Sequence, residues 1–135
     1  MPRVLTRCLL LLVALICLCG FRHQGPKAYL EIAQILASDG FNDTALAYYT
    51  KAVATQPDDP ELYQARAFFL LRLERTREAL ADLSRIVTLR PERPDGYLSR
   101  GLVYSQLGQT EQADRDFAAA CRLGDQSGCA FLQHP

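Results

Sequence analysis

This chain of 135 residues has few histidines, no tryptophan and no excess of either charge. Tryptophan is absent, the only histidines are His23 and His134, and 15 basic side chains balance 15 acidic ones. A general nucleic-acid binder needs clustered positive charge to displace counterions from phosphates, so the balance argues against that function. Two isolated histidines do not provide the ligand spacing of a metal site. We therefore expect no nucleic-acid partner and no bound metal.

The chain also lacks the motifs of catalysis. It contains no glycine-rich phosphate loop and no serine or cysteine nucleophile with a plausible histidine partner. The adjacent carboxylates Asp58 and Asp59 stand at a predicted helix start, where negative charge favours the helix dipole. We expect no catalytic residues, no cofactor and no enzymatic activity.

Long hydrophobic runs are scarce too, and the one present lies at the N-terminus. Arg3 and Arg7 precede an unbroken apolar run from Cys8 to Cys19. A run of about a dozen residues has the length of a signal-peptide core and is short for a membrane span of roughly 20 residues. We therefore interpret residues 1–21 as a signal peptide or a retained signal-anchor.

The end of this leader leaves three alternatives open. Cys17 and Cys19 are small residues in an A-x-A-like arrangement, which places cleavage before Gly20. A retained anchor would instead attach the chain to a membrane through residues 1–21. Bacterial lipoprotein signals have a small residue before the modified cysteine, where this chain has Ile16 and Leu18. All three alternatives place the remaining chain outside the cytoplasm, in the periplasm or secreted.

After the leader the sequence repeats every 34 residues. Three sets of positions show the period: Tyr29, Tyr63 and Tyr97; Ala45, Ala79 and Ala113; Pro26, Pro60 and Pro94. A fixed period of this length indicates an array of stacked supersecondary units. The predicted parts are a linker over 22–25, repeats over 26–59, 60–93 and 94–127, and a short C-terminal cap over 128–135.

Each copy predicts two helices joined by a tight turn. Apolar residues recur at helical spacing in both halves of every copy. Gly40 and Gly108 predict the ends of the first helices of copies one and three, because glycine readily adopts the left-handed conformation there. In copy two the turn falls at Glu74-Arg75. Thr76 and Thr110 are the predicted N-caps of the second helices that follow.

This pattern resembles the tetratricopeptide repeat family. The residues that carry the resemblance are an aromatic near the start of each copy, a small residue at the helix crossing (Ala33, Ala67, Gly101), the glycine stops, the alanines of the 34-residue period and the closing prolines Pro57 and Pro91. Three copies in register cover about three quarters of the chain. The resemblance implies an all-α fold, a right-handed αα-hairpin solenoid of three tetratricopeptide-like repeats.

The resemblance also implies that the first helix of each copy lines a concave groove for a protein or peptide ligand. The predicted protein-binding residues are Leu30, Gln34, Gln64, Phe68, Leu71, Arg72, Leu98 and Leu102. The alternative for each of the apolar ones is that it packs between copies. Chaperone-binding members hold a terminal carboxylate with basic and amide side chains, but those positions here are Leu30, Gln34, Ala65, Asp95 and Ser99. The resemblance therefore does not imply that this chain binds a terminal carboxylate.

Two copies share a charged pair that the first copy lacks. Arg66 precedes Asp82 by 16 residues, and Arg100 precedes Asp116 by the same interval. The equivalent positions in copy one are Ile32 and Tyr48. We predict that these positions face each other between the two helices of a hairpin. The other arginines of copy two alternate with acidic residues, which is typical of a solvated, ion-paired face.

The third copy ends differently, with Cys121 and Cys129 in place of a closing proline region. This tail resembles that of cysteine-rich secreted αα-repeat proteins, whose hairpins carry disulfides at this spacing. The resemblance implies a Cys121–Cys129 disulfide, with two inert buried thiols as the alternative. The sequence therefore favours an exported scaffold that binds a protein or peptide. The alternative is a membrane-anchored accessory subunit of an envelope assembly or secretion complex.

Overall fold

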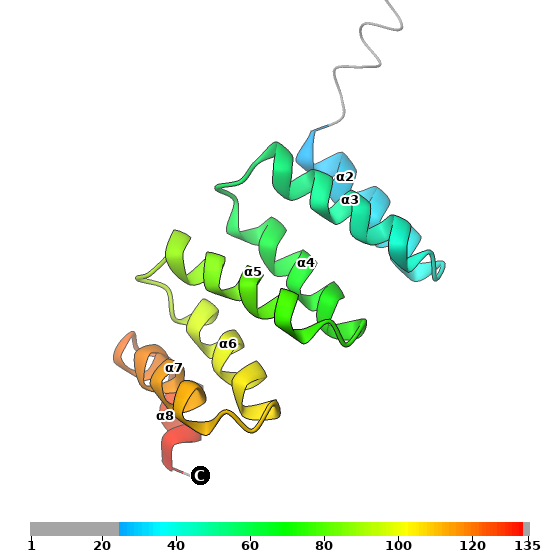
Figure 1. The fold of residues 1–135 in the computed structure, drawn as a ribbon. Coiled ribbons are helices and arrows are strands. Elements are labelled where there is room, and N and C mark those ends of the chain that lie inside the picture. The colour runs from blue at the N-terminus through cyan, green and yellow to red at the C-terminus, as the bar shows by residue number, and fades with distance from the viewer. Residues whose placement is uncertain (1–24, 134–135) are drawn as a thin grey trace, which may run out of the picture. The chain divides into compact units, whose positions relative to one another are not determined.

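The computed structural model describes residues 25–133, so the predicted leader over 1–21 lies outside the described residues. Seven α-helices and no strand make up this part of the chain (Figure 1). Their bounds are α2 Pro26–Ser38, α3 Asn42–Thr55, α4 Pro60–Arg72, α5 Thr76–Leu89, α6 Pro94–Gln106, α7 Thr110–Arg122 and α8 Gln126–Gln133. The predicted all-α fold of repeated helical hairpins is confirmed.

Proline begins the first helix of every copy. Pro26, Pro60 and Pro94 are the first residues of α2, α4 and α6. The missing N–H of proline costs nothing there, and its fixed φ suits the first turn. Asp59 adds a cap to α4, because its Oδ1 accepts a hydrogen bond of 2.9 Å from the Glu61 N–H.

The turns inside the hairpins all use one left-handed residue. Gly40 and Gly108 have φ angles of 84° and 70°, as predicted, and Glu74 takes the same role with φ 58°. In each turn the next N–H donates to the carbonyl oxygen five residues before it, at 2.9 Å: Phe41 to Leu36, Arg75 to Leu70 and Gln109 to Tyr104. This bond satisfies a carbonyl that the helix end leaves without a partner.

The two predicted threonine N-caps are wrong by one residue. Thr76 and Thr110 are the first helical residues of α5 and α7, and their N-caps are Arg75 and Gln109. The Arg75 carbonyl already accepts hydrogen bonds from the N–H groups of Glu78 and Ala79. Each second helix begins one residue earlier than predicted because the left-handed residue, Glu74 or Gly108, makes a tight turn. The residue that directly follows it is then already the N-cap.

The described helices divide between two compact units, the first with α2 and α3 and the second with α4 to α8. In the first unit α2 packs against α3. Its buried core residues are Ala33, Ala37, Ala45, Tyr49, Ala52 and Val53. Ala33 is fully buried between the two helices, and its small side chain lets them approach closely, which is the role predicted for it.

In the second unit α4 packs against α5, α5 against α6, α6 against α7, and α7 against α8 (Figure 1). The buried apolar residues are Leu62, Tyr63, Ala67, Phe69, Leu70, Ala79, Leu83, Ile86, Val103, Ala113, Phe117 and Ala120. Gly101 makes room for the Phe117 ring, since a Cβ built on Gly101 would lie 2.8 Å from that ring. The segment predicted as a short cap begins within α8, a helix of eight residues.

Candidate functional site

The second unit contains a half-open groove of about 280 Å³ on the side of α4 and α6. Its lining residues are Phe68 and Leu71 from α4, Leu83 from α5, and Ser99, Leu102, Val103 and Gln106 from α6. None of these side chains carries a charge. A mostly apolar lining with a few neutral polar groups suits an apolar side chain of a bound peptide.

Helical spacing brings the lining residues together. Phe68 and Leu71 are three residues apart on α4, and the four residues from α6 fall at intervals of three, four and seven from Ser99. Residues at these intervals share one helix face. Phe68 and Leu102 are equivalent positions of successive copies, and 49% and 38% of their surfaces are exposed. The repeat thus places two large apolar side chains on the same groove.

Three of the predicted protein-binding residues line this groove: Phe68, Leu71 and Leu102. Gln64 and Leu98 lie half-buried on the same two helices but are not part of the lining. Arg72 is exposed at the end of α4, and its guanidinium carbon lies 5.6 Å from the centre of the Phe69 ring.

The remaining two predicted residues, Leu30 and Gln34, lie on α2 in the first unit and take no part in the lining. Leu30 is half-buried and Gln34 is exposed. A ligand-binding role for any of the eight residues stays a prediction.

The prediction missed the floor of the groove. Leu83 belongs to the second helix of its copy, whereas the family resemblance selected only first-helix residues. Leu83 and Val103 are both buried and form the bottom of the groove, whereas Phe68 and Leu102 are exposed at its surface. Val103 could have been predicted from the sequence, because it comes four residues after Ser99 and so shares a helix face with it.

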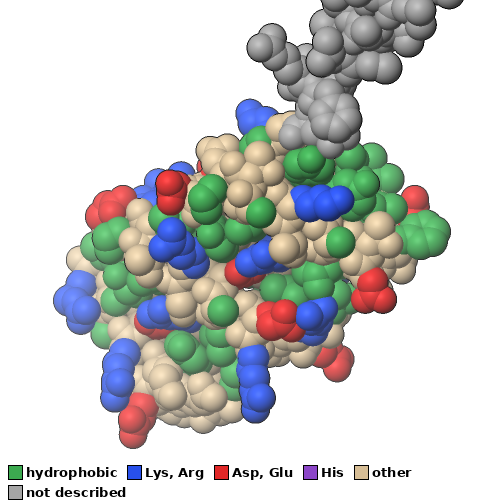
Figure 2. Space-filling model, turned by 45° about the horizontal axis from the view of Figure 1, so that its top comes forward, with side chains coloured by type: hydrophobic (Ala, Val, Ile, Leu, Met, Phe, Trp, Pro, Cys, Tyr) green, Lys and Arg blue, Asp and Glu red, His purple; other side chains and the backbone are tan. Residues whose placement is uncertain are grey.

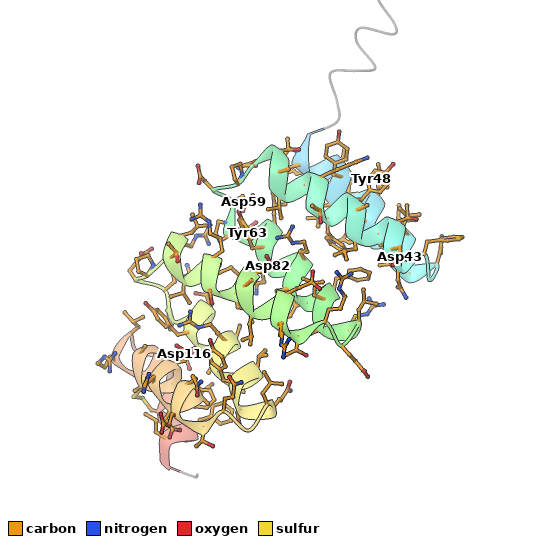
Figure 3. All side chains as sticks on the ribbon, in the orientation of Figure 1. Asp43, Tyr48, Asp59, Tyr63, Asp82 and Asp116 are labelled. Carbon is orange, nitrogen blue, oxygen red and sulfur yellow. A yellow bond between two sulfur atoms is a disulfide. The ribbon has the colours of Figure 1, made fainter. Side chains whose placement is uncertain are left out.

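The predicted contact between Arg66 and Asp82 is confirmed. Arg66 Nε donates to Asp82 Oδ2 at 2.8 Å, and Nη2 donates to Oδ1 at 2.6 Å. Asp82 is 4% exposed and lies between α5 and α4 (Figure 3). A bidentate pair of this kind fixes the relative position of the two helices through geometry as well as charge.

The second pair repeats this arrangement between α6 and α7. Arg100 Nε and Nη2 donate to the two Asp116 carboxylate oxygens at 2.7 and 2.8 Å, and Nη1 reaches Ser84 Oγ on α5 at 3.2 Å. Hydrogen bonding to these carboxylates raises the pKa of Arg66 and of Arg100, against the opposing effect of burial. Both arginines therefore stay charged, and they hold α4 and α6 in place beside the groove.

The remaining arginine pairs are more exposed. Arg75 binds Glu78 with two hydrogen bonds of 2.6 and 2.9 Å, and Arg93 Nε lies 3.3 Å from Asp95 Oδ1. On the face shown in Figure 2, acidic side chains lie among the basic ones, with hydrophobic groups between them. The exposed pairs of Arg75 and Arg93 fit the ion-paired, solvated face that the sequence predicted for the arginines of copy two, and such pairs contribute little to stability.

The described residues contain no group of three or more His, Cys, Asp or Glu side chains that could hold a metal ion. Within the same part of the chain, every helix is too short or too polar to cross a membrane.

The two C-terminal cysteines meet between α7 and α8. The Cα atoms of Cys121 and Cys129 are 4.7 Å apart, and their sulfur atoms are joined as in a disulfide. This Cα separation lies in the range that a disulfide bridges.

Comparisons with known proteins agree with this architecture. Two family models described as tetratricopeptide repeat match residues 26–68 and 94–123. No curated protein sequence matches the chain significantly.

Solved structures of similar fold include the first tetratricopeptide domain of Spaghetti (RPAP3) bound to the HSP90 peptide SRMEEVD. It is 25% identical, with a TM-score of 0.67 over 82% of this chain and 89% of that one. A tetratricopeptide repeat protein from Parabacteroides merdae is also 25% identical, with a TM-score of 0.70 over 80% of this chain and 44% of that one. The Arabidopsis OM64 tetratricopeptide domain is 20% identical, with a TM-score of 0.67 over 82% and 93%. The chain belongs to the tetratricopeptide repeat family.

Proposed function

We propose that this protein is a non-catalytic scaffold that binds a segment of another protein in the groove lined by α4, α5 and α6. The observation that carries the proposal is the pair of exposed apolar side chains, Phe68 and Leu102, on an uncharged groove. A buried apolar anchor at the centre of an interface contributes more binding energy than the polar groups around it.

The similar structure of the first Spaghetti domain supports this proposal, because that domain is bound to a peptide. We do not extend the same peptide to this chain. Asp95 and Ser99 stand on α6 where chaperone-binding relatives have residues that hold a terminal carboxylate, and Asp95 is itself paired with Arg93. Neither side chain supplies the positive charge that would bind a terminal carboxylate, so we propose an internal segment with an apolar anchor.

We also propose that the scaffold works outside the cytoplasm. The apolar leader with Arg3 and Arg7 and the joined Cys121–Cys129 pair support this location, since disulfides persist in oxidising compartments. The alternative is a membrane-anchored accessory subunit of an envelope assembly. Fractionation with N-terminal sequencing separates them: a soluble chain beginning near Gly20 excludes the anchor, and an intact N-terminus in the membrane fraction excludes cleavage.

Site-specific photo-cross-linking in the producing cell tests the groove itself. A photoreactive residue replaces Leu102 in one variant and Leu123 in a control, because these leucines are equally exposed, at 38% and 39%, and Leu123 lies outside the lining. We expect a discrete protein adduct from position 102 that is missing from position 123. Adducts from position 123 alone would move the interface away from the groove.

A further inference from the structure

A second depression, of about 410 Å³, lies in the same unit where α4 and α6 end and α5 begins. Its lining residues are Glu74, Arg75, Thr76, Arg77 and Glu78 from the turn and the start of α5, and Leu107 directly after α6. None of them lines the groove of Phe68 and Leu102. The proposed binding of one apolar anchor therefore leaves this depression without a role.

The groove and the second depression meet at the C-terminal ends of α4 and α6. Gln106 lines the groove, and the next residue, Leu107, lines the second depression. On the other helix Leu71 lines the groove, and Glu74 lines the second depression three residues later. Consecutive Cα atoms are only about 3.8 Å apart, so one lining begins where the other ends. A ligand that leaves the groove at this end enters the second depression directly.

Leu107 gives the second depression an apolar surface. Its side is 45% exposed, more than the 38% of Leu102 in the groove. Arginine side chains beside it can cover apolar groups with their methylene stems while their charged ends stay in water. Arg75 is bound to Glu78 by two hydrogen bonds of 2.6 and 2.9 Å, so these two charges offset each other. The second depression thus offers a further apolar contact with a charged rim.

Arg72 stands at the border between the two. It is exposed, it ends α4, and it follows the groove residue Leu71. Its guanidinium carbon lies 5.6 Å from the centre of the Phe69 ring, a contact that favours one position of the cation. Among the described residues Arg72 forms no ion pair, not even with Glu74 two residues later. A carboxylate on the ligand would supply the partner that this cation lacks.

We propose that the ligand segment extends from the groove over the ends of α4 and α6 and places a second apolar side chain on Leu107. Between its two apolar anchors it carries an acidic residue that pairs with Arg72. The inference rests on the proposed function, because the first anchor is the one that the groove of Phe68 and Leu102 accepts. The partner is a protein with an exposed apolar–acidic–apolar segment.

Helix geometry sets the spacing of the two anchors. Leu102 and Leu107 are five residues apart in the sequence, which corresponds to about 7.5 Å along a helix axis. An extended ligand chain advances about 3.3 Å per residue, and the sideways step between the groove and the second depression adds to the path. We expect the two apolar residues of the ligand roughly three or four positions apart.

Selection from a displayed library of random peptides on the immobilised full chain tests this extension. The wild type should select peptides with an acidic residue between two apolar residues at roughly this spacing. Selection on Leu107→Ser should lose the second apolar residue, and selection on Arg72→Gln should lose the acidic one. Leu123→Ser and Arg122→Gln are matched controls that should keep the whole pattern, since Leu123 also directly follows its helix and Arg122 also ends one.

A synthetic peptide with the selected pattern gives the size of each contact by isothermal titration calorimetry. Leu107→Ser should weaken its binding by about five- to tenfold, because an apolar contact is lost. Arg72→Gln should weaken it by about three- to fivefold at low salt, and by less at high salt, because the ion pair is exposed. Both controls should stay within about 1.5-fold of wild type. Circular dichroism verifies that each variant is folded.

The outcomes separate the extension from the groove itself. Peptides that lose binding in Leu102→Asp but keep wild-type affinity in both Leu107→Ser and Arg72→Gln would overturn the extension and leave the proposed function intact. Peptides that depend on Leu107 and not on Leu102 would overturn the proposed function. A wild-type selection that yields no acidic residue between two apolar ones would also overturn the extension.

Discussion

Arg66 and Asp82, 16 residues apart in the chain, form a bidentate ion pair that joins α4 to α5, with donor–acceptor distances of 2.6 and 2.8 Å. Arg100 and Asp116 repeat the pair one copy later. The first copy has Ile32 and Tyr48 at the same positions. Two copies therefore carry a charged pair at positions where the first copy has two apolar side chains, of which Ile32 is 37% exposed.

Replacing Asp82 by alanine should destabilise the protein by about 2–4 kcal/mol, because Arg66 would remain in the hairpin without its carboxylate. The Arg66 side chain is 20% exposed, which lets water offset part of the loss. Urea unfolding followed by circular dichroism measures the change. Asp114→Ala is the matched control, since Asp114 is an exposed carboxylate on α7, and it should change stability by less than about 0.5 kcal/mol.

The apolar residues that copy one has at these positions suggest a rescue experiment. The double variant Arg66→Ile/Asp82→Tyr should recover at least half of the stability lost by Asp82→Ala, because replacing both members of a buried pair leaves no unpartnered charge. Urea midpoints of the single and double variants give the coupling. A double variant as unstable as the sum of its singles would show that the pair and the apolar residues are not interchangeable.

Glu74→Gly should stabilise the protein by about 0.5–1 kcal/mol. Glu74 has a φ of 58°, a left-handed conformation that glycine adopts without the steric cost of a Cβ. The reciprocal change Gly108→Glu, at φ 70°, should destabilise by about 1 kcal/mol. Thermal melts of both variants check the prediction, and a loss of stability in Glu74→Gly would contradict it.

Gly101→Ala should destabilise by about 1–3 kcal/mol, because the new methyl group would lie 2.8 Å from the Phe117 ring and 3.2 Å from the Asp116 Cβ. Copies one and two have alanine at this position, so the cost arises from the Phe117 ring and not from the helix crossing. Adding Phe117→Leu to Gly101→Ala should then cost less than Phe117→Leu does alone. Equal costs in the two backgrounds, measured by urea unfolding, would contradict the steric explanation.

The helices were predictable because their ends depend on local residues. Proline at Pro26, Pro60 and Pro94 and glycine at Gly40 and Gly108 act through backbone geometry that needs no tertiary contact. The 16-residue Arg–Asp interval was equally informative, since it recurs with the period.

Other features depend on tertiary contacts and were missed. The floor of the groove includes Leu83, a residue of the second helix, and only the packing of three helices brings it under Phe68 and Leu102. Glu74 was placed in a turn, but its left-handed conformation is imposed by its neighbours in spite of its side chain. Phe131 was in register with the earlier tyrosines, and this unused signal pointed to α8.

The affinity of the cross-linked partner for three purified versions of the chain tests the central claim most directly. Isothermal titration calorimetry would compare wild type with Leu102→Asp, which places a charge in the groove, and with Leu123→Asp, an equally exposed leucine outside it. We predict binding weaker by about tenfold or more for Leu102→Asp and within about twofold of wild type for Leu123→Asp. Wild-type affinity in a correctly folded Leu102→Asp variant would contradict the account.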